Sequence, residues 1–176
     1  EKSANKIFDE MSEFAKYAFN KSHAACYAVV AYRTAYLKAY YPAEFMASML
    51  NSYLGNLDKV PEYIDECKRM GIQILKPDIN KSFEKFTVEV NNSEAVGKIR
   101  FGLGAIKNVG KTPVENIVAE RQENGEYKNF TDFCERIADT QVNKKCVESL
   151  IKSGAFDCFE QTRSTLLASF ETIIDT

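Results

Sequence analysis

Residues 19–45 have the sequence FNKSHAACYAVVAYRTAYLKAYYPAEF, and this stretch predicts one long helix from Phe19 to Phe45. At ~100° per residue, the chain's only histidine shares one narrow stripe of the helix with five other residues, so that the stripe comprises His23, Tyr27, Val30, Ala31, Thr34 and Lys38. A second face, which we assign to the core, comprises Cys26, Val29, Tyr36, Leu37 and Tyr40.

The same stretch is locally basic in a chain whose net charge is −2. Between Glu13 and Glu44 there is no acidic residue, and the basic residues are Lys16, Lys21, Arg33 and Lys38. Unpaired backbone N–H groups at a helix start, beside Lys21, Ser22 and His23, favour a phosphate site. The alternative is a core helix with solvated lysines, because Ser is a common N-cap residue and a lone His is more often structural.

The composition is that of a folded chain with local charge patches. The 176 residues, 45% of them apolar, fit one domain or two small ones. The five cysteines form no CxxC pair, which makes a zinc site improbable and favours reduced thiols and a cytoplasmic location. No apolar run approaches the ~20 residues of a membrane span, so no membrane partner is expected. The chain begins at Glu1, in the middle of a helical pattern, and we expect a piece of a longer protein.

The spacing of apolar residues predicts a mainly α fold in three segments. Residues 1–75 form a helical segment, with helices over 2–18, after Pro42 and over 57–70. Residues 76–102 form an extended linker and an antiparallel β-hairpin, with strands at 86–90 and 98–102 joined by 91–97. Residues 103–176 hold the remaining helices, at 130–137 with Thr131 as N-cap, at 144–152 after Asn143, and at 163–174.

Residues 103–118 predict a helix-hairpin-helix. A short helix ends near Asn108, a tight turn uses Gly110, and a second helix starts near Pro113. Backbone amides in such a turn can face a nucleic-acid phosphate, and close approach explains the glycine. Between Glu94 and Glu115 the chain again has no acidic residue, while it carries Lys98, Arg100, Lys107 and Lys111.

Two nucleotide-binding motifs are incomplete here. The run from Gly104 to Thr112 ends like a P-loop, but the glycine that this motif needs five positions before Gly110 is Ala105. The pair Gly102 and Gly104 lacks the third glycine of a dinucleotide fingerprint, and we attribute it to chance.

Residues 19–50 resemble the fingers-domain signature of bacterial replicative DNA polymerase III alpha subunits of the DnaE type. The resemblance rests on the Lys-Ser-His-Ala run at 21–24 and the Tyr-Pro-Ala-Glu-Phe-Met-Ala run at 41–47. It continues through residues 65–67, 76–80, 102–107 and 153–157, and so covers nearly the whole chain.

This resemblance implies contacts with the incoming nucleotide and with DNA. The residues implied for the nucleotide are Lys21, Ser22, His23, Tyr27, Thr34 and Lys38. Those implied for the DNA backbone, without sequence readout, are Lys107, Asn108, Gly110 and Lys111. Asn108 stands where such a hairpin often has glycine, and Asn tolerates left-handed backbone geometry.

The resemblance also implies that polymerisation needs parts beyond this chain. In the family, the catalytic aspartates and their Mg²⁺ belong to a palm domain N-terminal to this segment, so we expect the isolated chain to be inactive and to hold no cofactor. The implied partners are primer-template DNA, the incoming dNTP, the remaining polymerase domains and other replisome subunits, with the sliding clamp bound outside this chain. The alternative is a stand-alone helix-hairpin-helix module that binds DNA or acts as a scaffold, without an enzymatic role.

Overall fold

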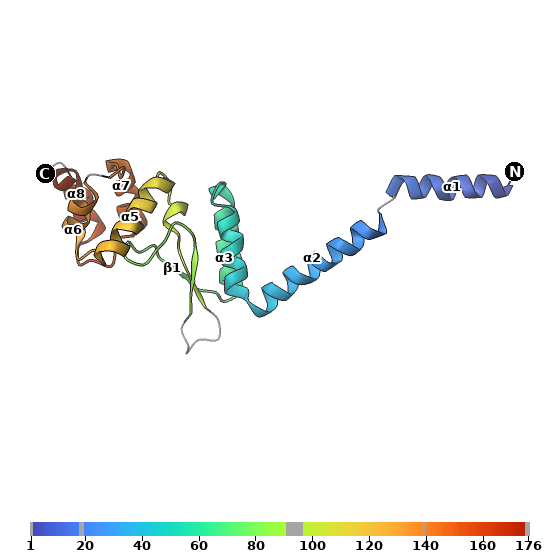
Figure 1. Ribbon diagram of the computed structural model, residues 1–176, viewed down its shortest axis with the longest axis horizontal. Coiled ribbons are helices and arrows are strands. Elements are labelled where there is room, and N and C mark those ends of the chain that lie inside the picture. Colours follow the sequence, from blue (N-terminus) through green and yellow to red (C-terminus); the bar gives the residue numbers. More distant parts are fainter. Residues whose placement is uncertain (1, 18–19, 91–96, 139, 175–176) are drawn as a thin grey trace. The chain divides into compact units, whose positions relative to one another are not determined.

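The computed structural model describes residues 2–17, 20–90, 97–138 and 140–174 (Figure 1). Within them the chain forms eight α-helices and one three-stranded sheet, which confirms the predicted mainly α class. Contacts divide the chain into two units, residues 1–40 and residues 41–176. The predicted segment boundaries at 75/76 and 102/103 remain a prediction.

The first unit contains helices α1 (Lys2–Tyr17) and α2 (Lys21–Tyr40). The predicted single helix over 19–45 is wrong at its C-terminal end, because α2 ends at Tyr40 and a new helix starts at Pro42. Tyr41 adopts φ −132° and ψ 57°, outside the helical region, since the ring of a following proline disfavours helical geometry in the residue before it. Phe19 lies outside the described residues.

The first unit exposes its apolar side chains. No residue of α2 is buried, and the large apolar side chains of α1 that are exposed are Ile7, Phe8, Met11 and Phe14. The assignment of Cys26, Val29, Tyr36, Leu37 and Tyr40 to a core is therefore wrong within this unit. The described parts of α1 and α2 leave this face of α2 uncovered.

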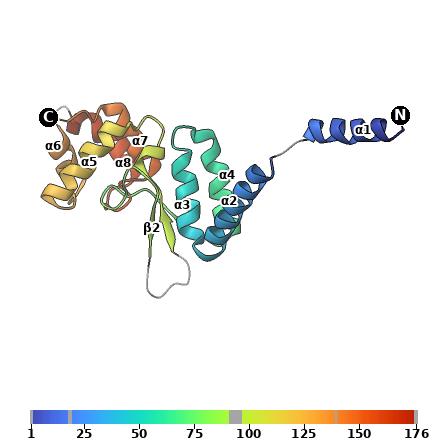
Figure 2. The same ribbon diagram turned by 45° about the vertical axis from the view of Figure 1, so that its right-hand side comes forward.

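The second unit begins with a helical pair on a small sheet. Helix α3 (Pro42–Ser52) is followed by the 3₁₀ turn η1 (Leu57–Lys59) and α4 (Val60–Arg69), and Figure 2 shows α3 and α4 side by side. Strands β2 (Thr87–Glu89) and β3 (Lys98–Arg100) pair antiparallel, as predicted, with Val88 opposite Ile99. The predicted connection over 91–97 lies outside the described residues except for Gly97.

Strand β1 (Ile74–Leu75) adds a parallel edge to β3, which gives the order β1-β3-β2. The sequence predicted only an extended segment there. Helices α3 and α4 and the sheet share one apolar cluster, whose buried members are Ala43, Met46, Ala47, Leu50, Val60, Cys67, Ile72, Phe86 and Ile99.

A second apolar cluster is built by the C-terminal helices. These are α5 (Lys111–Asn124), α6 (Phe130–Ile137), α7 (Lys144–Ser153) and α8 (Arg163–Ile174), preceded by the 3₁₀ turn η2 (Leu103–Ala105). Phe130, Phe133 and Phe156 pack with their rings in mutual contact at its centre. The predicted cap Asn143 is confirmed, since its side chain accepts from the Cys146 N–H. For α6 the cap is Asn129, not Thr131, because the Asn129 side chain accepts from the Asp132 N–H.

One buried arginine connects residues 79–83, which precede the β2–β3 hairpin, to this C-terminal cluster. Arg121, only 7% exposed, donates from Nη1 to the carbonyl oxygens of Ile79, at 2.7 Å, and Ser82, at 3.0 Å. Its guanidinium also lies over the Phe83 ring. The Ile79 N–H donates to the Ala155 carbonyl at 2.8 Å. Residues 79–83 are therefore held by the C-terminal helices.

The glycines at 102 and 104 have a packing role. A Cβ on Gly102 would lie 2.6 Å from the Glu84 carbonyl oxygen, and one on Gly104 would lie 2.9 Å from the same atom. The close approach lets Leu103 and Gly104 donate their N–H groups to Phe83 and Glu84. Both positions therefore need a residue without Cβ, a packing requirement that the sequence does not predict.

Among the described helices, none is long and apolar enough to cross a membrane.

Candidate nucleotide and nucleic-acid interfaces

The start of α2 is capped by Asn20, a residue that the sequence analysis did not single out. Its side-chain Oδ1 accepts from the Ser22 N–H at 2.9 Å, and its carbonyl accepts from the Ala24 N–H at 3.1 Å. The cap therefore uses one of the backbone donors that we had assigned to a phosphate. The signal was present in the sequence, because Asn directly before a helix is among the preferred caps.

His23 and Tyr27 form one exposed ring pair in the first two turns of α2. Their ring centroids are 4.4 Å apart, with an interplanar angle of 42°. This places both rings on one face, as the predicted stripe requires. Lys21 and Ser22 are exposed in the same first turn as His23, and this turn contains no acidic residue. At ~100° per residue, Lys21 lies about 160° and Ser22 about 100° around the helix from His23. We call these four exposed residues, which supply a cation, a hydroxyl and two rings at the start of α2, the α2 start cluster.

Thr34 and Lys38 lie far from the α2 start cluster. Lys38 follows Lys21 by 17 residues in the same helix, which at 1.5 Å per residue is about 26 Å along the axis. The Thr34 hydroxyl donates to the carbonyls of Val30, at 3.1 Å, and Ala31, at 2.9 Å. Its proton is thus already used inside the helix, so Thr34 has none to give to a phosphate oxygen. One triphosphate cannot span all six predicted residues.

The predicted short helix ending near Asn108 is only the 3₁₀ turn η2, which ends at Ala105, and the second helix begins at Lys111, before Pro113. A residue other than the predicted one makes the turn between them. Asn108 is the one non-glycine residue with positive φ in the described chain, at 66°. Gly110 is the N-cap of α5, with φ −77° and ψ 164°, a conformation open to any residue. Assignment of the tight turn to Gly110 is therefore wrong, whereas the tolerance of Asn108 for left-handed geometry is confirmed.

The glycine at 110 matters for what it leaves uncovered. It provides no side chain to cap α5, and Pro113 in the first turn has no N–H of its own. The start of α5 therefore presents the N–H groups of Lys111 and Thr112 without a side-chain cap. Partial positive charge at such a helix start attracts phosphate oxygens.

The lysines of the turn are exposed and only weakly engaged. Lys107 is exposed, and Lys111 Nζ lies 3.6 Å from Glu115 Oε1, with both side chains more than half exposed. Exposed pairs of this kind contribute about 0–1 kcal/mol, so a phosphate can replace the carboxylate at little cost. Asn108 Nδ2 donates to Ser149 Oγ on α7 at 3.4 Å, which anchors the turn between the two lysines.

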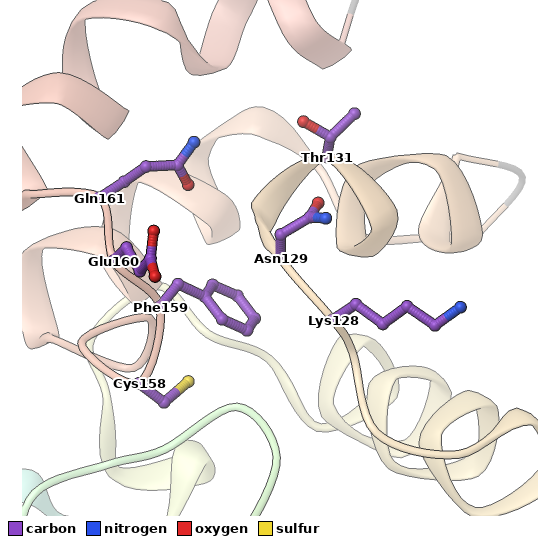
Figure 3. A pocket seen from close by; sticks show the side chains of 7 residues that line it. All are labelled: Lys128, Asn129, Thr131, Cys158, Phe159, Glu160 and Gln161. Atoms are coloured by element: carbon purple, nitrogen blue, oxygen red, sulfur yellow. The ribbon is translucent and has the colours of Figure 1, made fainter.

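One pocket belongs to neither predicted site. It measures about 510 Å³ (Figure 3) and is lined by Lys128, Asn129, Thr131, Cys158, Phe159, Glu160 and Gln161. The helix start inside it is already capped, because Asn129 accepts from the Asp132 N–H and Asp132 from the Lys128 N–H. Burial raises the pKa of the Cys158 thiol to about 11, so this sulfur is not an activated nucleophile at neutral pH.

No group of three His, Cys, Asp or Glu side chains within the described ranges could hold a metal ion. The three cysteines that are buried, Cys67, Cys134 and Cys146, are free thiols. Desolvation raises the pKa of each of them, to about 11, about 12 and about 11 respectively.

Comparison with known proteins identifies one matching family model and several similar proteins that share one name. A family model described as a helix-hairpin-helix motif matches residues 71–166, which is more than half of the chain. The chain is 47% identical over 172 residues to the DNA polymerase III subunit alpha of Neisseria meningitidis serogroup B, covering 98% of this chain and 15% of that protein. It is 46% identical over 175 residues to the same subunit of Thermus aquaticus, covering 99% and 14%. For the Vibrio cholerae subunit the identity is 45% over 171 residues, covering 97% and 14%.

Proposed function

Because this chain belongs to the helix-hairpin-helix family and is homologous, over nearly all of its length, to one segment of DNA polymerase III alpha subunits, we propose that it is the fingers segment of a bacterial DNA-directed DNA polymerase. The chain spans about one seventh of the length of the relatives it matches, at 15% and 14%. The proposal therefore concerns a contribution to polymerisation by part of an enzyme.

The observation that carries the proposal is the α2 start cluster. Lys21 supplies a cation and His23 a ring N–H toward the β and γ phosphate oxygens, where charge develops as the leaving group departs. Tyr27 packs against the imidazole at 4.4 Å between centroids, which restricts the orientation of His23. The Ser22 hydroxyl adds a donor beside them.

Thr34 and Lys38 take a separate part in this proposal. The distance of Lys38 from Lys21 along α2 assigns it to another group of the substrate or of the template, not to the same triphosphate. Thr34 can act only as a hydrogen-bond acceptor, through its oxygen lone pairs, since its hydroxyl proton is bonded within the helix.

The hairpin holds the DNA backbone in this proposal. The uncapped start of α5 and the side chains of Lys107 and Lys111 meet phosphate oxygens, while Asn108 fixes the turn that spaces them and Gly110 leaves the amides accessible. None of these groups reads a base, so binding is independent of sequence and falls with salt.

Catalysis itself requires groups elsewhere in the polymerase. In this proposal, the palm carboxylates and their Mg²⁺ belong to another domain. The partners are then primer-template DNA, the incoming dNTP, the other domains of the subunit and further replisome subunits, including a sliding clamp bound outside this chain.

A crossed pair of variants tests the two sites. In an alpha subunit that carries this segment in place of its own, Lys21→Ala with His23→Ala should raise the KM for dNTP and lower kcat, with primer-template affinity nearly unchanged. Lys107→Ala with Lys111→Ala should weaken primer-template binding and leave the KM for dNTP and kcat nearly unchanged. If the first pair leaves nucleotide kinetics unchanged, the nucleotide site is refuted.

One observation favours a second candidate, a DNA-binding or scaffold module without an enzymatic role. The family model covers residues 71–166 and does not include α2. In that case only the hairpin lysines matter, and the crossed experiment shows a DNA phenotype with no nucleotide phenotype.

A further inference from the structure

The face of α2 opposite Tyr27 carries a column of tyrosines. Tyr32, Tyr36 and Tyr40 follow one another at four-residue intervals and are 71%, 44% and 68% exposed. Adjacent rings lie 6.4 Å and 4.5 Å apart between centroids. At ~100° per residue, Tyr36 is about 180° around the helix from Tyr27. We call these three residues the tyrosine ladder.

A hollow and a cation accompany the ladder. The hollow has a volume of about 360 Å³ and is lined by Tyr32, Arg33, Tyr36 and Leu37. Arg33 is exposed, and no acidic residue occurs between Glu13 and Glu44. The surface therefore combines exposed aromatic rings with positive charge and lacks a local acid that would repel phosphate.

We propose that the tyrosine ladder, together with Arg33, binds unpaired bases of a single-stranded nucleic acid. Aromatic rings accept every base on their faces, and a nearby guanidinium attracts the backbone phosphates. This goes beyond the proposed nucleotide and duplex contacts and uses the face of α2 opposite Tyr27. In a polymerase the strand would be the unpaired template.

The spacing of the ladder selects an extended strand. Four residues of helix advance about 6 Å, which exceeds the about 3.4 Å per nucleotide of one strand in B-DNA. Bases that meet successive tyrosines must therefore be pulled apart. A base between two rings needs about 7 Å, twice the contact distance, and both ring separations in the ladder are shorter. Each base thus stacks on the outward face of a ring and not between two rings.

The other exposed apolar face in this unit lacks the charge that favours a nucleic acid. On α1 the apolar residues Ile7, Phe8, Met11 and Phe14 share the helix with three acidic residues, Asp9, Glu10 and Glu13, which balance its three lysines, Lys2, Lys6 and Lys16. The contrast with the acid-free ladder is what points to an anionic strand at α2. A protein surface is the competing occupant of the ladder, and the experiment separates the two.

The test is a titration of the whole chain with labelled oligothymidylate and, separately, with a labelled blunt duplex. Tyr32→Ala with Tyr36→Ala should weaken single-strand binding about tenfold or more and leave duplex binding unchanged. The matched control is Tyr32→Phe with Tyr36→Phe, which keeps the rings and should keep the affinity. Ala favours helix more than Tyr does, so circular dichroism should show that α2 persists.

A second readout locates the contact. Near-ultraviolet irradiation of an oligonucleotide that contains 5-bromouracil should cross-link it to Tyr32, Tyr36 or Tyr40, as peptide mass spectrometry would show. The proposal is overturned if the wild-type chain does not bind the single strand, if the Ala variant binds it equally well, or if single-strand and duplex binding fall together. Loss of self-association in the Ala variant, with unchanged oligonucleotide binding, would identify a protein-docking face and overturn it too.

Discussion

The side-chain amide of Asn108 donates to the hydroxyl of Ser149 at 3.4 Å, and the backbone of Asn108 has φ 66°. The hydrogen bond joins the turn of the helix-hairpin-helix to α7. The positive φ of Asn108 lets the chain reverse between η2 and α5. Both depend on one residue that stands between Lys107 and Lys111. The spacing of these two lysines is therefore set by Asn108.

Substitution of Asn108 should separate backbone geometry from side-chain contact. Asn108→Gly keeps access to positive φ and loses only the long bond to Ser149, so the melting temperature should change little. Asn108→Val places a β-branched residue in left-handed geometry, which costs on the order of 1–3 kcal/mol. Thermal unfolding measures both variants. Equal melting temperatures for Gly and Val would contradict the assigned turn.

Duplex binding should depend on the hairpin lysines in a salt-dependent way. Lys107→Ala with Lys111→Ala removes two phosphate contacts, so the slope of log affinity against log salt should fall by about 1.8, at about 0.9 per contact. Fluorescence anisotropy with a labelled primer-template checks this. Lys59→Ala with Lys68→Ala removes two exposed lysines paired with Glu62 and Asp65, and this control should leave the slope unchanged.

The buried Arg121 should be a strong determinant of stability. Arg121→Met removes the donors to the carbonyls of Ile79 and Ser82, which leaves these oxygens unsatisfied, and we expect a loss of about 2–4 kcal/mol in the free energy of unfolding. Urea denaturation measures it. The control Arg69→Met breaks an exposed pair with Glu66 and should cost less than about 1 kcal/mol. Similar losses for both would refute the role of Arg121.

The sheet should weaken in acid through Glu89. Arg100 donates from Nε and Nη2 to its carboxylate at 2.8 and 3.1 Å, and this guanidinium holds the pKa of Glu89 below its usual value. Because the pKa of Glu89 is lower in the folded state than in the unfolded state, ionised Glu89 stabilises the fold above its unfolded-state pKa of about 4.3. This stability is lost as the pH falls through the folded-state pKa. Wild type should therefore exceed Glu89→Gln in stability at pH 7, and the difference should shrink in strong acid. A pH-independent difference would contradict this origin.

Local patterns predicted most of the second unit. Asn143 before α7 and Gly154 after it mark that helix in the sequence, and the structure has the cap and a left-handed Gly154 with φ 86°. The paired strands β2 and β3 follow from alternation. Parallel pairing of β1 could not be predicted, because its partner is 25 residues away and only two residues pair.

Predictions for the candidate sites were less complete, for a physical reason. Periodicity correctly placed His23 and Tyr27 on one face, but it cannot tell an exposed apolar face from a buried one, and so Tyr36 and Tyr40 were assigned to a core. The Ser22 N–H is bonded to Asn20, and the Thr34 hydroxyl is bonded to a carbonyl of its own helix. The spacing of residues in the sequence does not predict either hydrogen bond. The roles of the nucleotide and DNA residues stay predictions.

The contacts of residues 79–83 with the C-terminal helices determine where a folded fragment of this protein can begin. A fragment that starts at Leu103 would lose Ile79, a fully buried member of the C-terminal cluster, and Asn80, which exchanges two bonds with the backbone of Tyr127. Expression of the hairpin module alone should therefore include the run from Gly71 onward. Shorter clones should yield protein that aggregates, and a failed DNA-binding assay on them would say nothing about the hairpin.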